Sequence, residues 1–316
     1  MKKTKSRKSR ASGRTPAKAR SPRPSVATLI RSTASRLKRA RLVFAHGTTD
    51  PTAEAAFIVG ESLGIHPDHV GSRAGMAVTD AQRRKIDALV ERRIVTRKPA
   101  AYLLQRIYML GVPFHVDERT IVPRSYLGEI IGSELFAGES FSLLPDTGAI
   151  ASVLDLCTGS GCLAILAALR FPKAKVDAVE LSKDALGVAR KNVADHRLKK
   201  RVRLLHGDLF APVKRARYEL IIANPPYVDD AGMASLPLEC RHEPRLAFHG
   251  GRDGLSVIRR ILDEAGRHLN EGGGLLCEVG RGRALLERAY PGKKFLWLDT
   301  EESTGEVFWL DADQLR

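Results

Sequence analysis

Residues 152–170 read SVLDLCTGSGCLAILAALR, and this stretch decides the fold class of the chain. Its first five residues are typical of a buried strand, and residues 162–170 are typical of a helix. Gly159 and Gly161 lie in the turn between them, where glycine lets the backbone approach a ligand and adopt unusual dihedral angles. In an open α/β sheet, ligands bind beyond the carboxyl ends of the strands. We therefore expect an α/β fold with a ligand site at this turn.

The alternation of strand and helix continues to residue 316. It predicts a doubly wound, mostly parallel, Rossmann-like sheet of seven strands. The last two strands are separated by only about five residues, so they should pair antiparallel at one side of the sheet. After SVLDL, the predicted strands are KVDAVEL, VRLLHGD, YELIIA, GLLCEVG, KFLWLD and EVFWL, with helices after Ser182 and near Leu255–Leu269.

A different, helical pattern precedes this sheet. Asp50 followed by Pro51 is typical of a helix start, and Thr79 or Asp80 can cap a second helix. Apolar residues follow both starts at helical spacing. The pattern predicts a small helical domain over residues 26–108.

A linker, MLGVPFHVDERTIVPRS, occupies residues 109–125. Short apolar runs flank Gly111 and the polar turn Asp117–Arg119, which indicates a β-hairpin that ends at Pro123. The α/β domain is then expected over residues 126–316.

The net charge of +16 is unevenly distributed along the chain. Residues 1–49 hold 15 Lys or Arg and no Asp or Glu, so the rest of the chain is nearly neutral. Residues 1–25 have almost no apolar side chains and are predicted to be a disordered basic tail. Such a tail can be a solubilising extension, a weak contact with RNA or the ribosome, or an organellar targeting peptide.

The four cysteines, Cys157, Cys162, Cys240 and Cys277, form no CxxC pair. This spacing argues against a zinc site or a disulfide framework and favours reduced thiols in a cytoplasmic protein. No window has the roughly eighteen apolar residues of a membrane span, and no secretory signal follows the first residue. We therefore expect no metal and no membrane contact.

Carboxylates follow the first three strands on the expected ligand side. Glu180 stands 21 residues after Gly159, where a carboxylate can accept hydrogen bonds from ribose hydroxyls, although an ordinary acid at a helix start would look the same. Asp208 could accept from an adenine amino group or only cap a loop. The pattern indicates a cofactor that carries adenosine.

Two kinds of cofactor carry adenosine at such a site. Gly159, Gly161 and Ala164 fit the dinucleotide pattern G-x-G-x-x-A, although a single match of this kind is weak and also fits a simple tight turn. Asp155 could receive the ammonium group of a methionine moiety or orient the loop backbone. A dinucleotide site has no use for the first role, so Asp155 favours S-adenosylmethionine.

The motif NPPY, Asn224 to Tyr227, follows the fourth strand beside the same site. The side-chain oxygen of Asn224 and the carbonyl of Pro225 can accept both N–H bonds of a planar NH2 group and aim its nitrogen at a methyl carbon. The prolines stiffen the loop, and Tyr227 can cover the planar group. The alternative is a proline-rich turn with a buried tyrosine.

These motifs resemble a known family. NPPY with DLCTGSG upstream is similar to the S-adenosylmethionine-dependent amino-methyltransferases, and RKPAAYLL with GVPFHVDERTIVPRS resembles the protein N5-glutamine methyltransferases, over residues 26–316. One branch of that family modifies the Gly-Gly-Gln motif of release factors and usually has Pro-Arg-x-x-Thr-Glu, whereas this chain has no Thr before Glu129. IVPRS, GEII and CRHEPRLAFHGGRDGL look like the branch that modifies the third large-subunit ribosomal protein, although Tyr126-Leu127 replaces its usual Pro-Ile.

The resemblance implies a role for each motif. The helical domain would recognise substrate, Arg124 would brace the hairpin against the catalytic domain, and no general base is needed. Glu180 would hold the ribose, and Asp208 and Leu209 would flank the adenine. Asn224, Pro225 and Tyr227 would receive the glutamine, with Asn224 also bordering the cofactor. The methionine end would be lined by Asp155, Cys157, Thr158, Gly159, Ser160 and Gly161.

Three other functions stay open at this stage. They are methylation of the release-factor glutamine, methylation of a base amino group in DNA or RNA, and a ribosome-assembly role in which methylation is incidental. The nearly neutral body and the aromatic content of 6% argue against a base substrate, because a flipped base needs aromatic stacking platforms.

Overall fold

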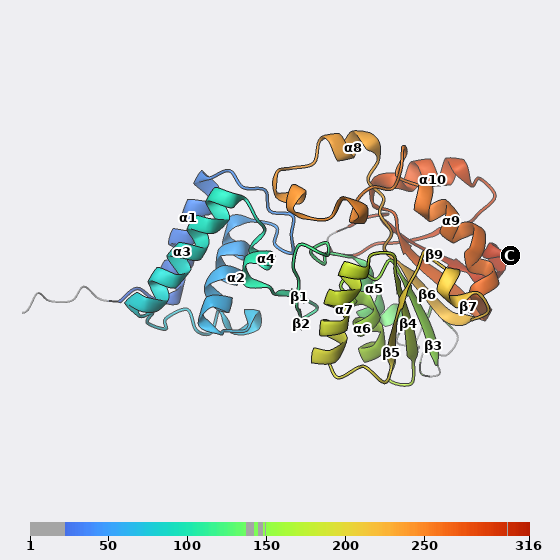
Figure 1. The fold of residues 1–316 in the computed structure, drawn as a ribbon, viewed down its shortest axis with the longest axis horizontal. Helices are drawn as coiled ribbons and strands as arrows, with labels where there is room; N and C mark the ends of the chain where they lie inside the picture. The colour runs from blue at the N-terminus through green and yellow to red at the C-terminus, as the bar shows by residue number, and fades with distance from the viewer. Residues whose placement is uncertain (1–22, 137–141, 145–147, 149, 302) are drawn as a thin grey trace, which may run out of the picture.

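The structure, a computed structural model, describes residues 23–136, 142–144, 148, 150–301 and 303–316. A helical domain and an α/β domain lie side by side, and a short β-hairpin lies between them (Figure 1). Residues 1–22 of the predicted basic tail lie outside the described residues. Every helix among the described residues is too short or too polar to cross a bilayer.

The helical domain is built on capped helices. Asp50 accepts N–H bonds at the start of α2, and Gly64 ends that helix in the left-handed conformation. Thr79, one of the two predicted caps, forms a capping box with Gln82 at the start of α3. Apolar faces of the helices pack into one buried cluster that includes Ile58 and Ile86. The helices are α1 (Val26–Arg39), α2 (Pro51–Leu63), η1 (Pro67–His69), α3 (Asp80–Thr96) and α4 (Ala100–Leu104).

The domain begins before the predicted boundary at residue 26. Ser25, which was assigned to the disordered tail, caps α1 by accepting the N–H of Thr28. The carbonyl of Pro24 accepts the N–H of Val78 at 2.9 Å. Both residues therefore belong to the folded domain, and the sequence pattern missed them because neither is part of a periodic apolar run.

The hairpin is shorter and begins earlier than predicted. Its strands are β1 (Ile107–Met109) and β2 (Val112–Phe114), which pair antiparallel. The turn between them is formed by Leu110 and Gly111, both at positive φ. The polar turn at Asp117 lies beyond β2 and outside the hairpin. Gly111 and Asp117 are both typical turn residues and lie close in sequence, so the pattern wrongly extended the hairpin to the turn at Asp117.

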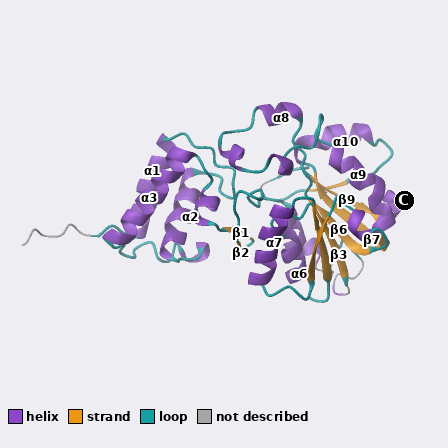
Figure 2. Ribbon diagram, in the orientation of Figure 1, coloured by secondary structure: helices purple, strands orange, loops and turns teal. Residues whose placement is uncertain are grey.

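Seven strands form one sheet, as predicted, and their order is β5-β4-β3-β6-β7-β9-β8. The sheet lies in the α/β domain (Figure 2). The first five in sequence are parallel, and β9 pairs antiparallel with both β7 and β8. The expected antiparallel pair at one side is therefore confirmed. The strands are β3 (Ser152–Leu156), β4 (Lys175–Glu180), β5 (Val202–His206), β6 (Tyr218–Ala223), β7 (Leu269–Glu278), β8 (Leu296–Leu298) and β9 (Val307–Asp311).

Both faces of the sheet are covered, which explains why its central strands are apolar throughout. Along β6, Leu220 and Ile222 belong to one buried cluster, whereas Ile221 and Ala223 belong to the other. The first cluster takes in α5 and α6, and the second takes in α9 and α11. The helices are α5 (Leu127–Gly132), α6 (Cys162–Arg170), α7 (Lys183–Asp195), α8 (Asp230–Ala234), α9 (Ser256–Ala265), α10 (Arg283–Ala289) and α11 (Ala312–Leu315).

Glu243, in the RHEP stretch, links the α/β domain to the helical domain and to the segment after the hairpin. Its buried carboxylate accepts two hydrogen bonds from Arg124 at 2.8 and 3.0 Å and one from the N–H of Val122 at 2.8 Å. His46 of the helical domain lies 3.2 Å away through Nε2. Arg124 thus braces the segment after the hairpin against the α/β domain, a role that the family resemblance implied for the hairpin itself.

Candidate active site

Two cavities lie at the carboxyl edge of the parallel strands. The first, of about 180 Å³, is lined by Glu180, Asp208 and Leu209, and we call it the cofactor cavity. The second, of about 160 Å³, is lined by Pro225 and Tyr227, and we call it the acceptor cavity. Both are lined by Cys157, Gly159 and Asn224, so the glycine turn and the NPPY motif meet where the cavities join.

The glycine turn after β3 is held in an unusual backbone conformation. Cys157, Gly159 and Gly161 all have positive φ, at 59°, 55° and 81°. A non-glycine residue rarely adopts this conformation, so Cys157 stays there only because its surroundings hold it. A Cβ added at Gly159 would have no neighbour within 4 Å, whereas one at Gly161 would lie 3.3 Å from Ala189. Gly159 therefore faces open space at the cavities, and Gly161 is needed for packing against α7.

Asp155 lies beneath the turn and lines neither cavity. It is fully buried, and Oδ2 accepts the hydroxyl of Thr158 and, at 3.0 Å, the N–H of Ala164. Burial raises the pKa of Asp155 to about 7, although the bonds from Thr158 and Ala164 oppose the rise. Oδ1 has no hydrogen-bond partner among the described residues. Of the two roles considered for Asp155, this position favours orienting the loop.

Glu180 ends β4 with its carboxylate at the cofactor cavity. Oε2 accepts the N–H of Gly159 and Oε1 accepts the N–H of Ser182, both at 2.8 Å. A carboxylate has about four acceptor positions, so two stay available for a ligand. The same side chain can therefore fix the glycine turn and bind a pair of hydroxyl groups.

The far side of the cofactor cavity follows β5. Asp208 lines it and pairs with Arg260 at 2.7 Å, with about half of each side chain exposed. Leu209 is buried and has a positive φ of 47°, which directs the chain around the cavity. An apolar side chain beside a carboxylate suits a flat heterocycle with an amino group.

The Asn224 carboxamide is available to bind a ligand. Its side chain makes no hydrogen bond with the residues that the structure describes, although it lines both cavities. The next residue, Pro225, is buried, so this loop lies at the end of β6 without extending the sheet. A free acceptor at the junction of two cavities is suited to receiving a donor group.

Tyr227 is fixed by a buried glutamate. Its hydroxyl donates to Oε1 of Glu278 at 2.9 Å, while Oε2 accepts the hydroxyl of Ser125 at 2.6 Å and the N–H of Tyr126 at 3.1 Å. Burial raises the pKa of Glu278 to about 7, despite these three donors. The carboxylate thereby connects the NPPY motif to the start of α5.

A glycine-rich segment holds the other side of this motif. The N–H of Val228 donates to Phe248 at 2.8 Å, and the N–H of Gly250 donates back to Val228 at 2.9 Å. A Cβ at Gly250 would lie 2.8 Å from Cα of Tyr227, and one at Gly254 would lie 2.4 Å from its carbonyl oxygen. Only glycine allows this close approach, which explains the sequence HGGRDG.

Comparison with known proteins identifies the family. Residues 28–104 match the PrmC N-terminal domain, and residues 131–236 match the methyltransferase small domain. A ribosomal protein uL3 glutamine methyltransferase of Bradyrhizobium diazoefficiens is 58% identical over 90% of both chains. The chain belongs to this family of methyltransferases. Enzymes with the same name from Burkholderia pseudomallei and Bordetella pertussis are 44% and 43% identical, over 93% and 91% of this chain and 97% and 95% of theirs. The family predicted from NPPY and RHEP, and its ribosomal-protein branch, are confirmed.

Within this methyltransferase, the structure brings most of the predicted residues to one place. Cys157, Gly159, Glu180, Asp208, Leu209 and Asn224 line the cofactor cavity, and Thr158, Ser160, Pro225 and Tyr227 line the acceptor cavity. Asp155 and Gly161 lie beneath them. Sequence reasoning missed Glu278 and Ser125, which position Tyr227 and α5. The signal for Glu278 was present, since a carboxylate in the apolar strand GLLCEVG needs a partner.

Proposed function

We propose that this methyltransferase transfers the methyl group of S-adenosylmethionine to the side-chain nitrogen of a glutamine in ribosomal protein uL3. The observation that carries the proposal is the free Asn224 carboxamide at the junction of the cofactor and acceptor cavities. The relatives' shared name supplies the glutamine and uL3.

The residues at the cofactor cavity fit S-adenosylmethionine. Glu180 has acceptor capacity for the two ribose hydroxyls, and Asp208 with Leu209 offers an acceptor and an apolar surface for adenine. Gly159 leaves open space where the methionine part would lie. When bound, S-adenosylmethionine supplies an electrophilic methyl group attached to a positively charged sulfur.

Asn224 and Pro225 orient the acceptor. A carboxamide nitrogen is a weak nucleophile because its lone pair is delocalised, so its position decides the rate. The oxygen of Asn224 and the carbonyl of Pro225 accept its two N–H bonds and direct the nitrogen toward the cofactor cavity. Tyr227, held by Glu278, covers the planar group.

Proton removal needs no side chain in this scheme. A neutral amide nitrogen would need no base before it attacks, and the proton that the methylated nitrogen would then release can pass to water. The buried carboxylate near the amide, Glu278, is occupied by three donors from the protein. Its role is to position Tyr227.

From the ribosomal substrate we propose that the protein acts in the cytoplasm, where the basic residues before Thr49 would meet ribosomal RNA. Fifteen positive charges without a negative one would attract ribosomal RNA non-specifically. We propose that this part of the chain aids encounter with the ribosome or with uL3 bound to RNA, without contributing to the choice of glutamine.

Parallel incubations test the function. The enzyme and labelled cofactor are mixed separately with uL3, with a release factor and with nucleic acid, and transferred label is counted. We expect label on uL3 alone, and Asn224→Ala should lower turnover by roughly two to three decades, as when one preorganised partner is removed. Label only on the release factor would move the assignment to the sister branch, and label on a base would overturn a protein substrate.

A further inference from the structure

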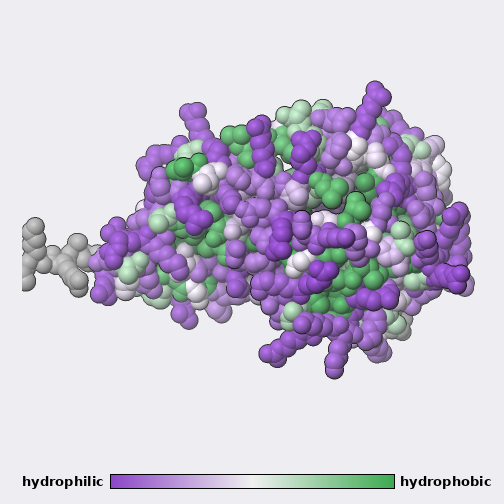
Figure 3. Space-filling model, in the orientation of Figure 1, coloured by the Kyte–Doolittle hydropathy of each residue, from purple (hydrophilic) through white to green (hydrophobic). Residues whose placement is uncertain are grey.

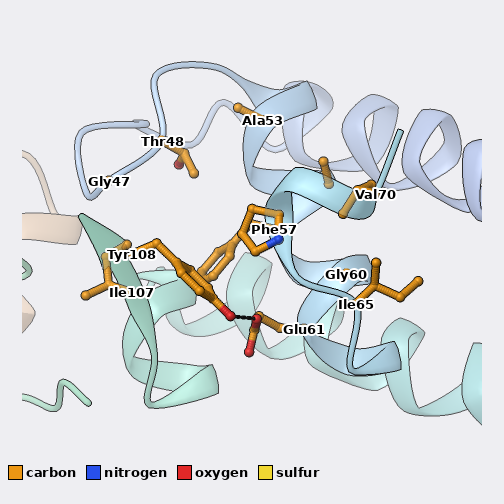
Figure 4. A pocket seen from close by; sticks show the side chains of 12 residues that line it. Gly47, Thr48, Ala53, Phe57, Gly60, Glu61, Ile65, Val70, Ile107 and Tyr108 are labelled. Carbon is orange, nitrogen blue, oxygen red and sulfur yellow. Dashed lines mark hydrogen bonds between the residues drawn. The ribbon is translucent and has the colours of Figure 1, made fainter. Parts of the chain in front are cut away.

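A track of adjoining cavities, each sharing lining residues with the next, leads away from the active site. The acceptor cavity shares Pro123, Ser125 and Tyr227 with a cavity of about 620 Å³ between the two domains, the interdomain cavity. That cavity shares Thr48 and Tyr108 with a third cavity, of about 250 Å³, inside the helical domain. We call the third one the helical-domain cavity (Figure 4). The track therefore begins at the NPPY motif and ends in the other domain.

Carbon atoms line most of the helical-domain cavity. Helix α2 contributes Ala53, Ala56 and Phe57, and β1 contributes Ile107 and the ring of Tyr108. The remaining apolar wall comes from residues around η1, namely Ile65, Pro67 and Val70. An apolar cavity of about 150 Å³ holds a benzene-sized molecule, so this one has room for a large apolar side chain.

The polar groups of this cavity already bind one another. Tyr108 donates its hydroxyl to Oε1 of Glu61 at 2.6 Å (Figure 4). Outside the cavity lining, Arg106 Nε lies 3.1 Å from Oε2 of Glu61. Burial, followed by the bond to Glu61, raises the pKa of Tyr108 to about 12, so the phenol stays protonated. The rest of the wall is mostly carbon, so a charged or strongly polar occupant would lose its hydration there without regaining hydrogen bonds. The cavity therefore selects an apolar group.

The walls are held in place without an occupant. The ring of Tyr108 meets Phe57 edge-on at 6.5 Å between centroids and His66 at 4.9 Å. Gly47, at a φ of 81°, packs so closely on β1 that an added Cβ would lie 2.4 Å from Ile107. A preformed site costs less conformational entropy when it binds.

We propose that the helical-domain cavity binds a large apolar side chain of uL3, on polypeptide that crosses the interdomain cavity from the target glutamine. This assignment rests on the proposed function, because a glutamine in the acceptor cavity requires its flanking polypeptide to lie across the neighbouring surface. The shared lining residues make the interdomain cavity the continuous path from that point. The helical-domain cavity would then be a second anchor for uL3, besides the acceptor cavity, and it would select one glutamine among many.

Filling the cavity tests this assignment. Ala56→Phe places a ring in the helical-domain cavity, and Ala56 lines neither the interdomain cavity nor the active site. The matched control is Ala88→Phe on the exposed face of α3. For wild-type enzyme that methylates intact uL3, we expect Ala56→Phe to raise KM for uL3 about tenfold to a hundredfold, the effect of losing one buried apolar side chain. The kcat and the affinity for S-adenosylmethionine should not change.

The outcomes separate the two proposals. If wild-type enzyme methylates uL3 and Ala56→Phe has the KM of Ala88→Phe, the anchor is wrong and the function stands. If wild-type enzyme leaves uL3 unmodified, the proposed function fails first.

A second measurement decides the matter if Ala56→Phe does not fold. A photo-crosslinking benzoylphenylalanine in place of Thr48, which lines both the helical-domain cavity and the interdomain cavity, should attach to uL3 through an apolar residue, whereas the same group in place of Ala88 should not. Equal crosslinking from both positions would overturn the anchor.

Discussion

The Tyr227 hydroxyl donates a 2.9 Å hydrogen bond to the buried Glu278 carboxylate, and this bond ties the NPPY loop to the end of β7. Since Ala223 pairs with Cys277, the residues that follow each of them lie at the same edge of the sheet. Glu278 therefore holds the NPPY loop at the edge of the sheet where Asn224 also lies. No cation is bonded to this carboxylate among the described residues, so ionising it in the buried site is unfavourable.

Glu278→Gln should change how stability depends on pH. Burial raises the pKa of Glu278 in the folded protein from 4.5 to about 7, so its contribution to stability is full below pH 4.5 and is lost as the pH rises to about 7. Glutamine does not titrate. The free energy of unfolding of Glu278→Gln relative to wild type should rise between pH 5 and 7, by at most roughly 1.4 kcal/mol per pH unit.

Urea unfolding of both proteins at several pH values measures this difference. Asp155, whose pKa is also raised to about 7, titrates in both proteins and cancels in the comparison. Parallel stability curves for the two proteins would show that Glu278 does not titrate in this range.

Glu243→Gln should destabilise the junction between the domains. The change removes a buried charge from Arg124 and should cost roughly 3 to 5 kcal/mol, as expected when one partner of a buried pair is lost. The control is Glu287→Gln, because the Arg283–Glu287 pair is half exposed and should contribute less than about 1 kcal/mol. Equal losses in the two variants, measured by urea unfolding, would contradict a special role for Glu243.

The same pair predicts an acid-sensitive junction. Burial alone would raise the pKa of Glu243, but His46 and Arg124 outweigh it and leave the pKa below its ordinary value. A lowered pKa gives stability that is present above the ordinary value of 4.5 and is lost as the pH falls below it. Wild type should therefore lose stability on acidification below that pH more steeply than Glu243→Gln.

Glu180→Ala should weaken S-adenosylmethionine binding by roughly 1 to 3 kcal/mol in titration calorimetry, the range for hydrogen bonds to a charged group. The loss has two sources, since Glu180 would bind the ribose and also fixes the N–H of Gly159. Asp195→Ala, an exposed change on α7 that lines none of the described cavities, should bind normally. Binding of NAD as tight as that of S-adenosylmethionine would refute the cofactor assignment.

Two truncations test where the folded domain begins. Removal of residues 1–22 should leave thermal stability nearly unchanged, because the tail has almost no apolar side chains. Removal of residues 1–25 also deletes the cap of α1 and the acceptor for Val78, and should cost roughly 1 kcal/mol or more. Equal stability of the two proteins would show that the helical domain begins at residue 26, as the sequence predicts.

The sequence predicted the sheet and the ligand edge because their signals are local. The glycines after β3, the carboxylate of Glu180 and the prolines after Asn224 each follow a strand, and parallel strands bring such positions together. Even the antiparallel end of the sheet followed from a short connection. The hairpin boundary was wrong because Gly111 and Asp117 are both good turn residues.

Long-range contacts could not be predicted in this way. Glu243 meets His46 and Arg124, and Glu278 meets Ser125, across more than a hundred residues of sequence. No periodicity connects such positions, and only the packing of the two domains brings them together. The helical-domain cavity arises for the same reason, since β1 closes a space left by α2 and η1. The apolar lining comes from side chains far apart in the sequence, and hydrophilic side chains cover most of the face in Figure 3.

The most direct test of the central claim is to locate the transferred methyl group. Intact uL3 is incubated with the enzyme and S-adenosylmethionine, digested, and sequenced by tandem mass spectrometry, with Asn224→Ala in parallel. The structure and the family predict one added methyl group on the side-chain nitrogen of a single glutamine, nearly abolished by Asn224→Ala. A methyl group on any other residue type, or one that Asn224→Ala forms as fast as wild type, would contradict the account.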